Sequence, residues 1–173
     1  NTVSTTTAST GGTISEKSTM RTGVAEMSGS FFQRVLVPVA NEDDGKATAA
    51  ALRPYVAGAD CTVIAVHVIE KAGGAPDKAS VEQRKQFARD IFAVVTDGLA
   101  DTDITLETEL RYGTDIASAL IDAAHELDAS AIVFTPRGGS RWRKLLTGDV
   151  THNLVNNSDI PILALPDREV SDT

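Results

Sequence analysis

The amino-acid sequence predicts an α/β protein built on a five-stranded parallel sheet with helices on both faces. From Phe31 onward, short apolar runs alternate with segments of helical periodicity, in the order β-α-β-α-β-α-β-α-β. Most of the apolar runs are nearly continuous, which is typical of strands buried on both faces. The links are short, so right-handed crossovers through the helices are expected to join consecutive strands.

The expected strands differ in how much of their surface is apolar. They cover residues 34–39, 61–69, 103–110, 130–135 and 160–165. The run that begins at Cys61 (CTVIAVHVI) is continuously apolar, and the cysteine itself is interpreted as a small apolar residue. Residues 103–110 alternate between apolar and polar instead, which predicts a strand with one more exposed face at the edge of the sheet.

The expected helices begin with polar residues and continue with apolar residues at helical spacing. They open at residues 40–45, 80–83, 113–115 and 148–149. Their apolar positions are Ala47, Ala51, Leu52 and Tyr55 in the first helix, Phe87, Ile91, Val94, Val95 and Leu99 in the second, Ile116, Leu120, Ile121, Ala124 and Leu127 in the third, and Val150, Leu154 and Val155 in the fourth.

Three local signals refine these helices. Asp43 and Asp44 favour the start of the first helix electrostatically. Pro54 lies inside the same helical pattern, so this helix is expected to be kinked or short there. Residues 80–83, Ser-Val-Glu-Gln, have the form of a capping box and predict that the second helix starts at Ser80.

The two ends of the chain differ from the unit between them. Residues 1–30 are rich in Ser, Thr and Gly and have no periodic apolar pattern, so they are expected to form a disordered tail. This segment also lacks the basic start and apolar core of a secretory signal. The expected α/β domain covers residues 31–166, and residues 167–173 form a short polar C-terminal tail.

Composition excludes several classes of protein. The chain has 173 residues and a net charge of −8, which argues against a general nucleic-acid binder. No apolar stretch is long enough to span a membrane. A single cysteine excludes an intramolecular disulfide and suits a reducing cytoplasm, and three scattered histidines do not form a metal motif. The acidic surface fits a salt-loving host and an ordinary acidic cytoplasmic protein equally well.

Residues 135–149 (TPRGGSRWRKLLTGD) carry the clearest sign of a binding site. Four cationic residues gather there, and no acidic residue stands between Asp128 and Asp149. They are Arg137, Arg141, Arg143 and Lys144. Glycines allow close backbone approach, and a helix start favours anions, so one interpretation is a phosphate-bearing ligand. The alternative is a solvated loop anchored by Trp142, Leu145 and Leu146.

The chain from about Gln33 to Leu165 resembles the universal stress protein family. Three blocks match in order and spacing: VLVPV at the first strand, VHVIE at the end of the second, and the stretch from AIVFTPRGG through LLTGDV to IPILAL. The resemblance implies the strand order 3-2-1-4-5. It also implies a homodimer that pairs the last strand, residues 160–165, across a two-fold axis.

Some members of this family bind ATP, and the resemblance places their motif in this chain in altered form. The binders carry G-x2-G-x9-G-(S/T) after the fourth strand and an Asp at the end of the first. Here Thr135 replaces the first glycine, Asp149 replaces the Ser or Thr, and Ala40 replaces the Asp, while Gly138 and Gly148 keep the other glycine positions. The ATP-binding motif is therefore degraded on its ribose and phosphate side.

The adenine side of the motif is better preserved. Pro38 and Val68 occupy the positions whose backbone flanks adenine in the binders, and Phe134 stands just before the altered glycine. The resemblance thus implies an adenine-nucleotide site, for ATP or AMP, at Pro38, Ala40, Val68, Phe134, Thr135, Arg137, Gly138, Gly148 and Asp149.

Asp149 determines how strongly the altered motif disfavours a phosphate. A carboxylate only accepts hydrogen bonds and is negative, whereas Ser or Thr can donate to a phosphate oxygen. A phosphate charge about 4 Å away would be repelled by roughly 1–4 kcal/mol, depending on exposure. A bound Mg²⁺, with Asp149 as a ligand, would reverse the sign, and Arg137, Arg141 and Lys144 would also compensate.

The histidines do not indicate catalysis. His67, near the end of a buried strand, is expected to be a hydrogen-bonded core residue and not a base. His125 is expected to be solvated on a helix surface, and His152 to lie on the surface one turn into the last helix. No nucleophile elbow, P-loop or dinucleotide fingerprint is present.

The sequence therefore predicts a cytoplasmic, stress-responsive regulatory dimer that senses an adenine nucleotide and is not an enzyme. The alternative is a nucleotide-independent scaffold that contacts a protein partner, such as the cytoplasmic face of a transporter, through residues 137–144. A slow nucleotide hydrolase is the third interpretation, but neither a base nor a water-positioning group is evident.

Overall fold

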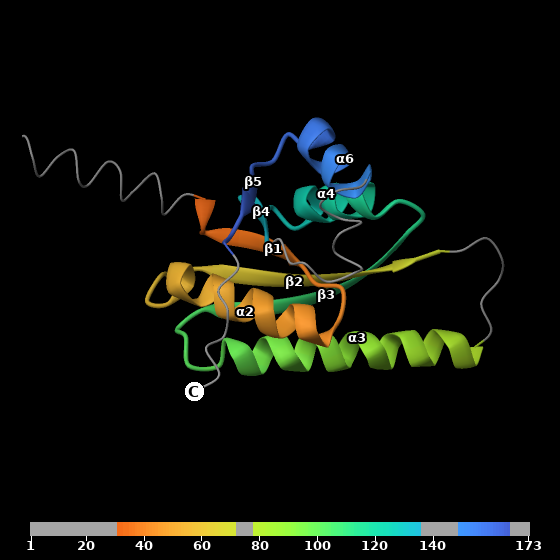
Figure 1. The fold of residues 1–173 in the computed structure, drawn as a ribbon, viewed down its shortest axis with the longest axis horizontal. Coiled ribbons are helices and arrows are strands. Elements are labelled where there is room, and N and C mark those ends of the chain that lie inside the picture. Colours follow the sequence, from red (N-terminus) through yellow and green to blue (C-terminus); the bar gives the residue numbers. More distant parts are fainter. Residues whose placement is uncertain (1–30, 72–77, 136–148, 167–173) are drawn as a thin grey trace, which may run out of the picture.

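The computed structural model describes residues 31–71, 78–135 and 149–166. Within these residues the chain forms one five-stranded parallel sheet in the order β3-β2-β1-β4-β5 (Figure 1). The strands are β1 (Arg34–Pro38), β2 (Thr62–Glu70), β3 (Thr105–Gly113), β4 (Ala131–Phe134) and β5 (Ile162–Ala164). The helices are α2 (Glu42–Val56), α3 (Lys78–Gly98), α4 (Ile116–Glu126) and α6 (Asp149–Asn157). The predicted fold class and strand order are confirmed.

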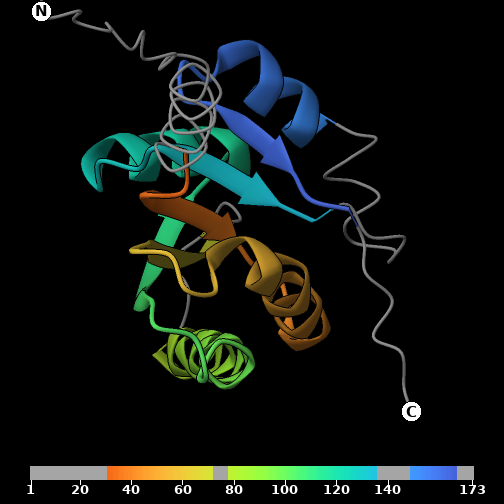
Figure 2. The ribbon, with the colours of Figure 1, turned by 90° about the vertical axis from the view of Figure 1, so that its left-hand side faces the viewer.

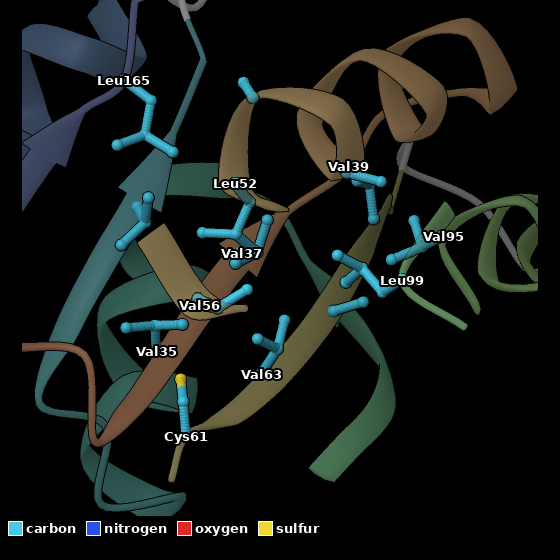
Figure 3. Packing of buried hydrophobic residues seen from close by; sticks show 14 of the residues in the cluster. Val35, Val37, Val39, Leu52, Val56, Cys61, Val63, Val95, Leu99 and Leu165 are labelled. Atoms are coloured by element: carbon cyan, nitrogen blue, oxygen red, sulfur yellow. The ribbon is translucent and has the colours of Figure 1, made fainter. Parts of the chain in front are cut away.

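The helices cover the sheet in two pairs, with α2 and α3 on one face and α4 and α6 on the other (Figure 2). Successive β1 side chains point to opposite faces. Val35 and Val37 pack with α2 and α3, whereas Leu36 packs with α4 and α6. All three are 0–1% exposed, so the continuous apolar run is buried on both faces, as the sequence predicted. The sheet therefore has one apolar core on each face. Figure 3 shows the first core, which lies between the sheet and the helices α2 and α3.

The edge strands behave differently from the central ones. β3 lies at one end of the sheet and none of its residues is fully buried, as its alternating sequence predicted. β5 lies at the other end and is only three residues long. Arg34 in the central strand reaches β3, where its guanidinium donates two hydrogen bonds to Glu107 at 3.0 and 2.7 Å.

One prediction about the helices is wrong, and a second is tested only in part. α3 begins at Lys78, so Ser80 lies inside its first turn and does not cap it. Lys78 and Ala79 are strong helix formers, which favours this earlier start. α2 continues to Val56, two residues beyond Pro54, so the helix does not stop at the proline, whereas the alternative of a kink there stays a prediction. Pro54 lies in the last turn, where few residues follow it within the helix.

Three expected apolar positions are less buried than their spacing suggested. Tyr55 in α2 is 40% exposed, while Val56 beside it is buried. Phe87, in the first half of α3, is 39% exposed, and the buried face of this helix consists of Ala88, Ile91, Val95 and Leu99. Val155 in α6 is 59% exposed, while Leu154 beside it is buried. In all three cases the buried position is taken by the neighbouring residue, Val56, Ala88 or Leu154.

No helix among residues 31–71, 78–135 and 149–166 is long and apolar enough to cross a membrane. The predicted tails at 1–30 and 167–173 lie outside the described residues.

Hydrogen bonds of Ser130 join the central strands β1 and β4 at their amino ends. The Arg34 N–H donates to the Ser130 hydroxyl at 3.1 Å, and the Ser130 N–H donates to the Arg34 carbonyl at 2.7 Å. The Ser130 hydroxyl also lies 2.9 Å from the Phe31 carbonyl, to which it can donate. β1 is therefore aligned with β4 from the first residue of the strand, and this alignment carries through to the carboxyl ends.

Candidate functional site

The sheet reverses its strand order between β1 and β4. β1 pairs with β2 on one side and β4 on the other, and the chain leaves β1 toward α2 but reaches α6, on the opposite face, after β4. Ligands of open α/β sheets bind where connections diverge in this way, beyond the carboxyl ends of the strands. The register Leu36↔Ile132 sets Pro38 level with Phe134 at this edge. The structure thus brings together two residues that were assigned to one site.

A buried carboxylate lies at the end of β1, although residue 40 is alanine. The Ala40 N–H donates to the Asp44 Oδ2 at 2.9 Å, and the Asp44 N–H donates to the Asn41 Oδ1 at 2.9 Å. Asn41 is the N-cap of α2, and Asp44 is 3% exposed. The sequence interpretation gave Asp44 only a general electrostatic role. The Asn-x-x-Asp spacing was the signal that would have indicated this local pairing.

Thr135 follows β4 and is 2% exposed. By the alternation of side chains it shares the sheet face of Ala131 and Val133, which pack in the core beneath α2. Its hydroxyl oxygen has no hydrogen-bond partner among the residues that the structure describes. The threonine that replaces the family's first glycine is therefore accommodated inside the protein. Phe134 before it is 7% exposed, and its carbonyl accepts a hydrogen bond from the Leu165 N–H at 2.8 Å.

Val39 is held by two neighbouring groups of β2. Its N–H donates to the Val66 carbonyl at 2.9 Å, and its carbonyl accepts a hydrogen bond from the His67 Nδ1 at 2.8 Å. His67 is 8% exposed, and its ring meets the Phe87 ring edge-on at a centroid distance of 5.7 Å. Burial lowers the pKa of His67 below its usual value of 6.5, although the bond to Val39 opposes this. The prediction of a hydrogen-bonded core histidine is confirmed.

The burial of His67 is expected to make the stability of the protein depend on pH. Since its pKa in the folded protein lies below 6.5, the unfolded chain binds more protons than the folded chain between these two values. The free energy of unfolding should therefore rise with pH through that window. The contribution of His67 is complete above about pH 6.5 and is lost as the pH falls toward the folded pKa.

Urea unfolding of the wild type and His67→Asn, from about pH 5 to pH 8, measures this effect. The free energy of unfolding should rise more steeply with pH in the wild type than in His67→Asn. His152→Gln is the matched control, because His152 is exposed on α6 and bonds Asn156 within its own helix at 2.9 Å. This control should keep the wild-type slope. Equal slopes for the wild type and His67→Asn would contradict a buried neutral imidazole.

The remaining titratable candidates lie apart from the strand ends. His125 is exposed, as predicted, and its Nε2 lies 2.7 Å from Asp159 Oδ1. Cys61 is buried, also as predicted, and desolvation raises the pKa of its thiol to about 11. Among the described residues no three His, Cys, Asp or Glu side chains gather as a metal site would require.

Several predicted site residues lie outside the described residues. They are Arg137, Gly138, Arg141, Arg143, Lys144 and Gly148. Asp149 is the first residue of α6, so the expected helix start is confirmed for the backbone at this position. Val68 lies in β2, two residues beyond the last β1–β2 pair, Pro38↔Val66.

A shallow apolar cleft of about 520 Å³ runs along the outer edge strand. It is lined by Phe134, Val155, Ser158, Asp159, Ile160, Pro161, Ile162 and Ala164. Asp159 is the one charged residue in this lining, and Val155 is more than half exposed. The cleft overlaps residues 160–165, where the resemblance placed the dimer contact.

Comparisons with known proteins agree with this architecture. A sequence model of the Universal stress protein family matches residues 31–166. Universal stress protein UspA from Lactobacillus plantarum is 20% identical, with a TM-score of 0.63 over 78% of this chain and 97% of that chain. The universal stress protein from Archaeoglobus fulgidus in complex with dAMP is 19% identical, with a TM-score of 0.53 over 78% and 98% of the two chains.

A further universal stress protein, solved in complex with cAMP, is 17% identical, with a TM-score of 0.56 over 78% of this chain and 97% of its own. A comparison with curated protein sequences found no match. Identities at this level show a shared fold, whereas the ligand has to be argued from the residues of the site.

Proposed function

The chain belongs to the universal stress protein family, and from this premise we propose that it is a regulatory protein that binds an adenine nucleotide where the carboxyl ends of β1 and β4 meet. The observation that carries the proposal is the divergence of the chain at Pro38 and Phe134, on neighbouring strands whose ends are level. Two proteins of the same fold were solved with dAMP and cAMP, which supports an adenine nucleotide as the ligand class.

The described residues suit the base end of such a ligand better than its phosphates. Pro38 and Phe134 are buried apolar residues at the strand ends, and the half-buried Val68 lies two residues beyond the β2 residue paired with Pro38. The Asp44 carboxylate lies at the Ala40 amide and would disfavour a phosphate nearby. We therefore propose that the base and sugar sit over the ends of β1, β2 and β4. The phosphates would lie toward the start of α6, where Arg137, Gly138 and Gly148 would contact them and Asp149 would oppose them unless Mg²⁺ intervenes.

We propose that two copies assemble through β5. The edge of this strand and the apolar cleft along it offer a nearly uncharged surface to a second sheet. The role proposed for the dimer is binding and regulation, with no catalytic residue. In the described residues His67 is committed to the Val39 carbonyl, and His125 and His152 bond exposed neighbours away from the strand ends.

The test is to purify the protein without added nucleotide, denature it and identify the released small molecules by mass spectrometry. Calorimetric titration with adenosine, AMP, ADP and ATP, with and without Mg²⁺, then measures how much each part of the ligand contributes to the affinity. We expect a dissociation constant below about 1 mM for at least one adenine nucleotide. GTP is the matched control for base recognition and should bind more weakly.

An empty protein that gives no heat with any adenine compound would overturn the proposal. The second candidate, a scaffold, would then be favoured by the cluster of cations at residues 137–144 in a chain of net charge −8. Changing Arg141, Arg143 and Lys144 to Glu should abolish binding of a protein partner in that case and leave the dimer intact.

A further inference from the structure

The hydrogen-bond ladder between β1 and β2 ends in an unusual way. In a parallel pair, one residue of a strand brackets its partner with an N–H and a carbonyl bond, and the pattern repeats every two residues. Val66 is paired with Pro38, and its carbonyl accepts the Val39 N–H. The next rung of this pattern would join the Val68 N–H to the Val39 carbonyl.

That rung is not formed. No backbone hydrogen bond joins Val68 to Val39, and the Val39 carbonyl accepts the imidazole Nδ1–H of His67 at 2.8 Å instead. A carbonyl is the acceptor here, so the neutral imidazole must carry its proton on Nδ1. A side chain of β2 has therefore taken the place of the β2 backbone at the last position of the ladder.

The missing rung leaves backbone groups of Val68 at the site. Successive residues of a strand in a parallel sheet direct their N–H and C=O groups to alternate neighbours. Lys71 donates to the Gly113 carbonyl of β3 at 2.8 Å, so the odd-numbered residues at this end face β3. The groups of Val66 and Val68 face β1, and β1 has ended before it reaches Val68. Val68 thus offers one donor and one acceptor to the place where β1 and β4 diverge.

We propose that His67 is a positioning residue, which caps the Val39 carbonyl, stops the β1–β2 ladder and thereby keeps the Val68 N–H and C=O available to the ligand. The proposal rests on the proposed function for the identity of that ligand, an adenine nucleotide. The adenine ring suits this pair of groups, since its edge carries an acceptor nitrogen beside an amino donor. His67 itself is buried, with its ring against Phe87.

Only a side chain with a hydrogen-bond donor at the place of the His67 Nδ1 can fill this role. The ring is 8% exposed and packs against Phe87, which limits its rotation. Its Nδ1–H therefore donates a hydrogen bond to one carbonyl in a fixed direction. The side-chain amide of asparagine branches at the same atom and can donate from a similar place. Leucine fills a similar volume without a donor. A buried carbonyl without a partner is costly, so the Val39 carbonyl should then recruit the Val68 N–H.

The experiment compares the wild type, His67→Asn and His67→Leu by amide hydrogen exchange, measured residue by residue with NMR, and by calorimetric titration with AMP. In the free wild type the Val68 amide should exchange with little protection, and AMP should slow it. In His67→Leu the same amide should exchange about a hundredfold more slowly without ligand, and AMP affinity should fall about tenfold or more. His67→Asn should restore both wild-type properties.

A purely structural role would give a different pattern, with lower stability but unchanged Val68 exchange and AMP affinity. Unchanged Val68 exchange in His67→Leu, or no rescue by His67→Asn, would overturn the inference. If His67→Leu does not fold, His67→Gln replaces it, because its amide lies one bond farther out and should not reach Val39. A wild type that binds no AMP would defeat the proposed function, while Val68 exchange in the free proteins would still decide whether His67 stops the ladder.

Discussion

Replacing Asp149 by serine is expected to increase the affinity for ATP without Mg²⁺ by about ten- to a thousandfold. Asp149 is the first residue of α6, where the partial positive charge of the helix start favours an anion. From the sequence, a carboxylate at residue 149 would compete with an anion for that place and repel a phosphate about 4 Å away by roughly 1–4 kcal/mol. Serine removes the charge and adds a hydroxyl that can donate to a phosphate oxygen.

Calorimetry of the wild type, Asp149→Asn and Asp149→Ser with ATP and with adenosine separates these effects. Asp149→Asn is the matched variant, since it removes the charge and keeps the shape, and it should recover most of the gain. Adenosine has no phosphate, so its affinity should be the same in all three proteins. Equal ATP affinities in the three proteins would contradict the idea that Asp149 opposes the phosphates. If the wild type binds ATP more tightly than both variants, and only when Mg²⁺ is present, Asp149 would instead be identified as a ligand of the metal.

Replacing Leu36 by alanine is expected to lower the free energy of unfolding by about 2–5 kcal/mol. Leu36 is 0% exposed in the central strand and packs with α4 and α6. Its neighbours in the same core, including Ile64 and Ile132, belong to the adjacent strands, so the sheet backbone restricts collapse around the lost atoms. The cost therefore includes both the lost transfer of apolar atoms from water and the cavity that remains.

Urea unfolding at one fixed pH measures this loss, with Leu110→Ala as the control. Leu110 lies in the edge strand β3 and is only partly buried, so its truncation should cost much less than that of Leu36. If the alanine variant of Leu36 does not fold, Leu36→Val should still show a measurable loss in the same direction. If Leu36→Ala lowers the free energy of unfolding no more than Leu110→Ala does, the packing of Leu36 between the sheet and the helices α4 and α6 would be contradicted.

The fold was predictable because its main determinants are local patterns. Continuous apolar runs predicted strands buried on both faces, and Val35, Leu36 and Val37 confirm this. Helix ends were less predictable, since α3 begins two residues before Ser80, where the capping-box pattern placed its start. The exposure of Tyr55, Phe87 and Val155 also escaped prediction, because spacing alone does not say which of two adjacent apolar residues faces the sheet.

The meeting of the strand ends at the candidate site was predictable, but the hydrogen bonds there were not. Strand order and the resemblance together placed Pro38 and Phe134 at one edge, and the structure brings them level. The bond from His67 to the Val39 carbonyl joins two strands 28 residues apart in sequence, and no local pattern reveals such a contact. The same holds for the buried hydroxyl of Thr135, whose surroundings depend on three-dimensional packing.

The serine that fastens β1 to β4 also bears on when the protein becomes functional during folding. The Arg34–Ser130 bond joins residues 96 positions apart, whereas β1 and β2 are linked through a single helix. Closing so long a loop costs more entropy than closing a short one, and long-range strand pairing is slow. In a growing or truncated chain that lacks β4, the β1–β4 junction that we propose as the ligand site is absent. A nucleotide that binds there as proposed would stabilise the protein only after β1 and β4 have paired, and it would not guide the earlier steps of folding.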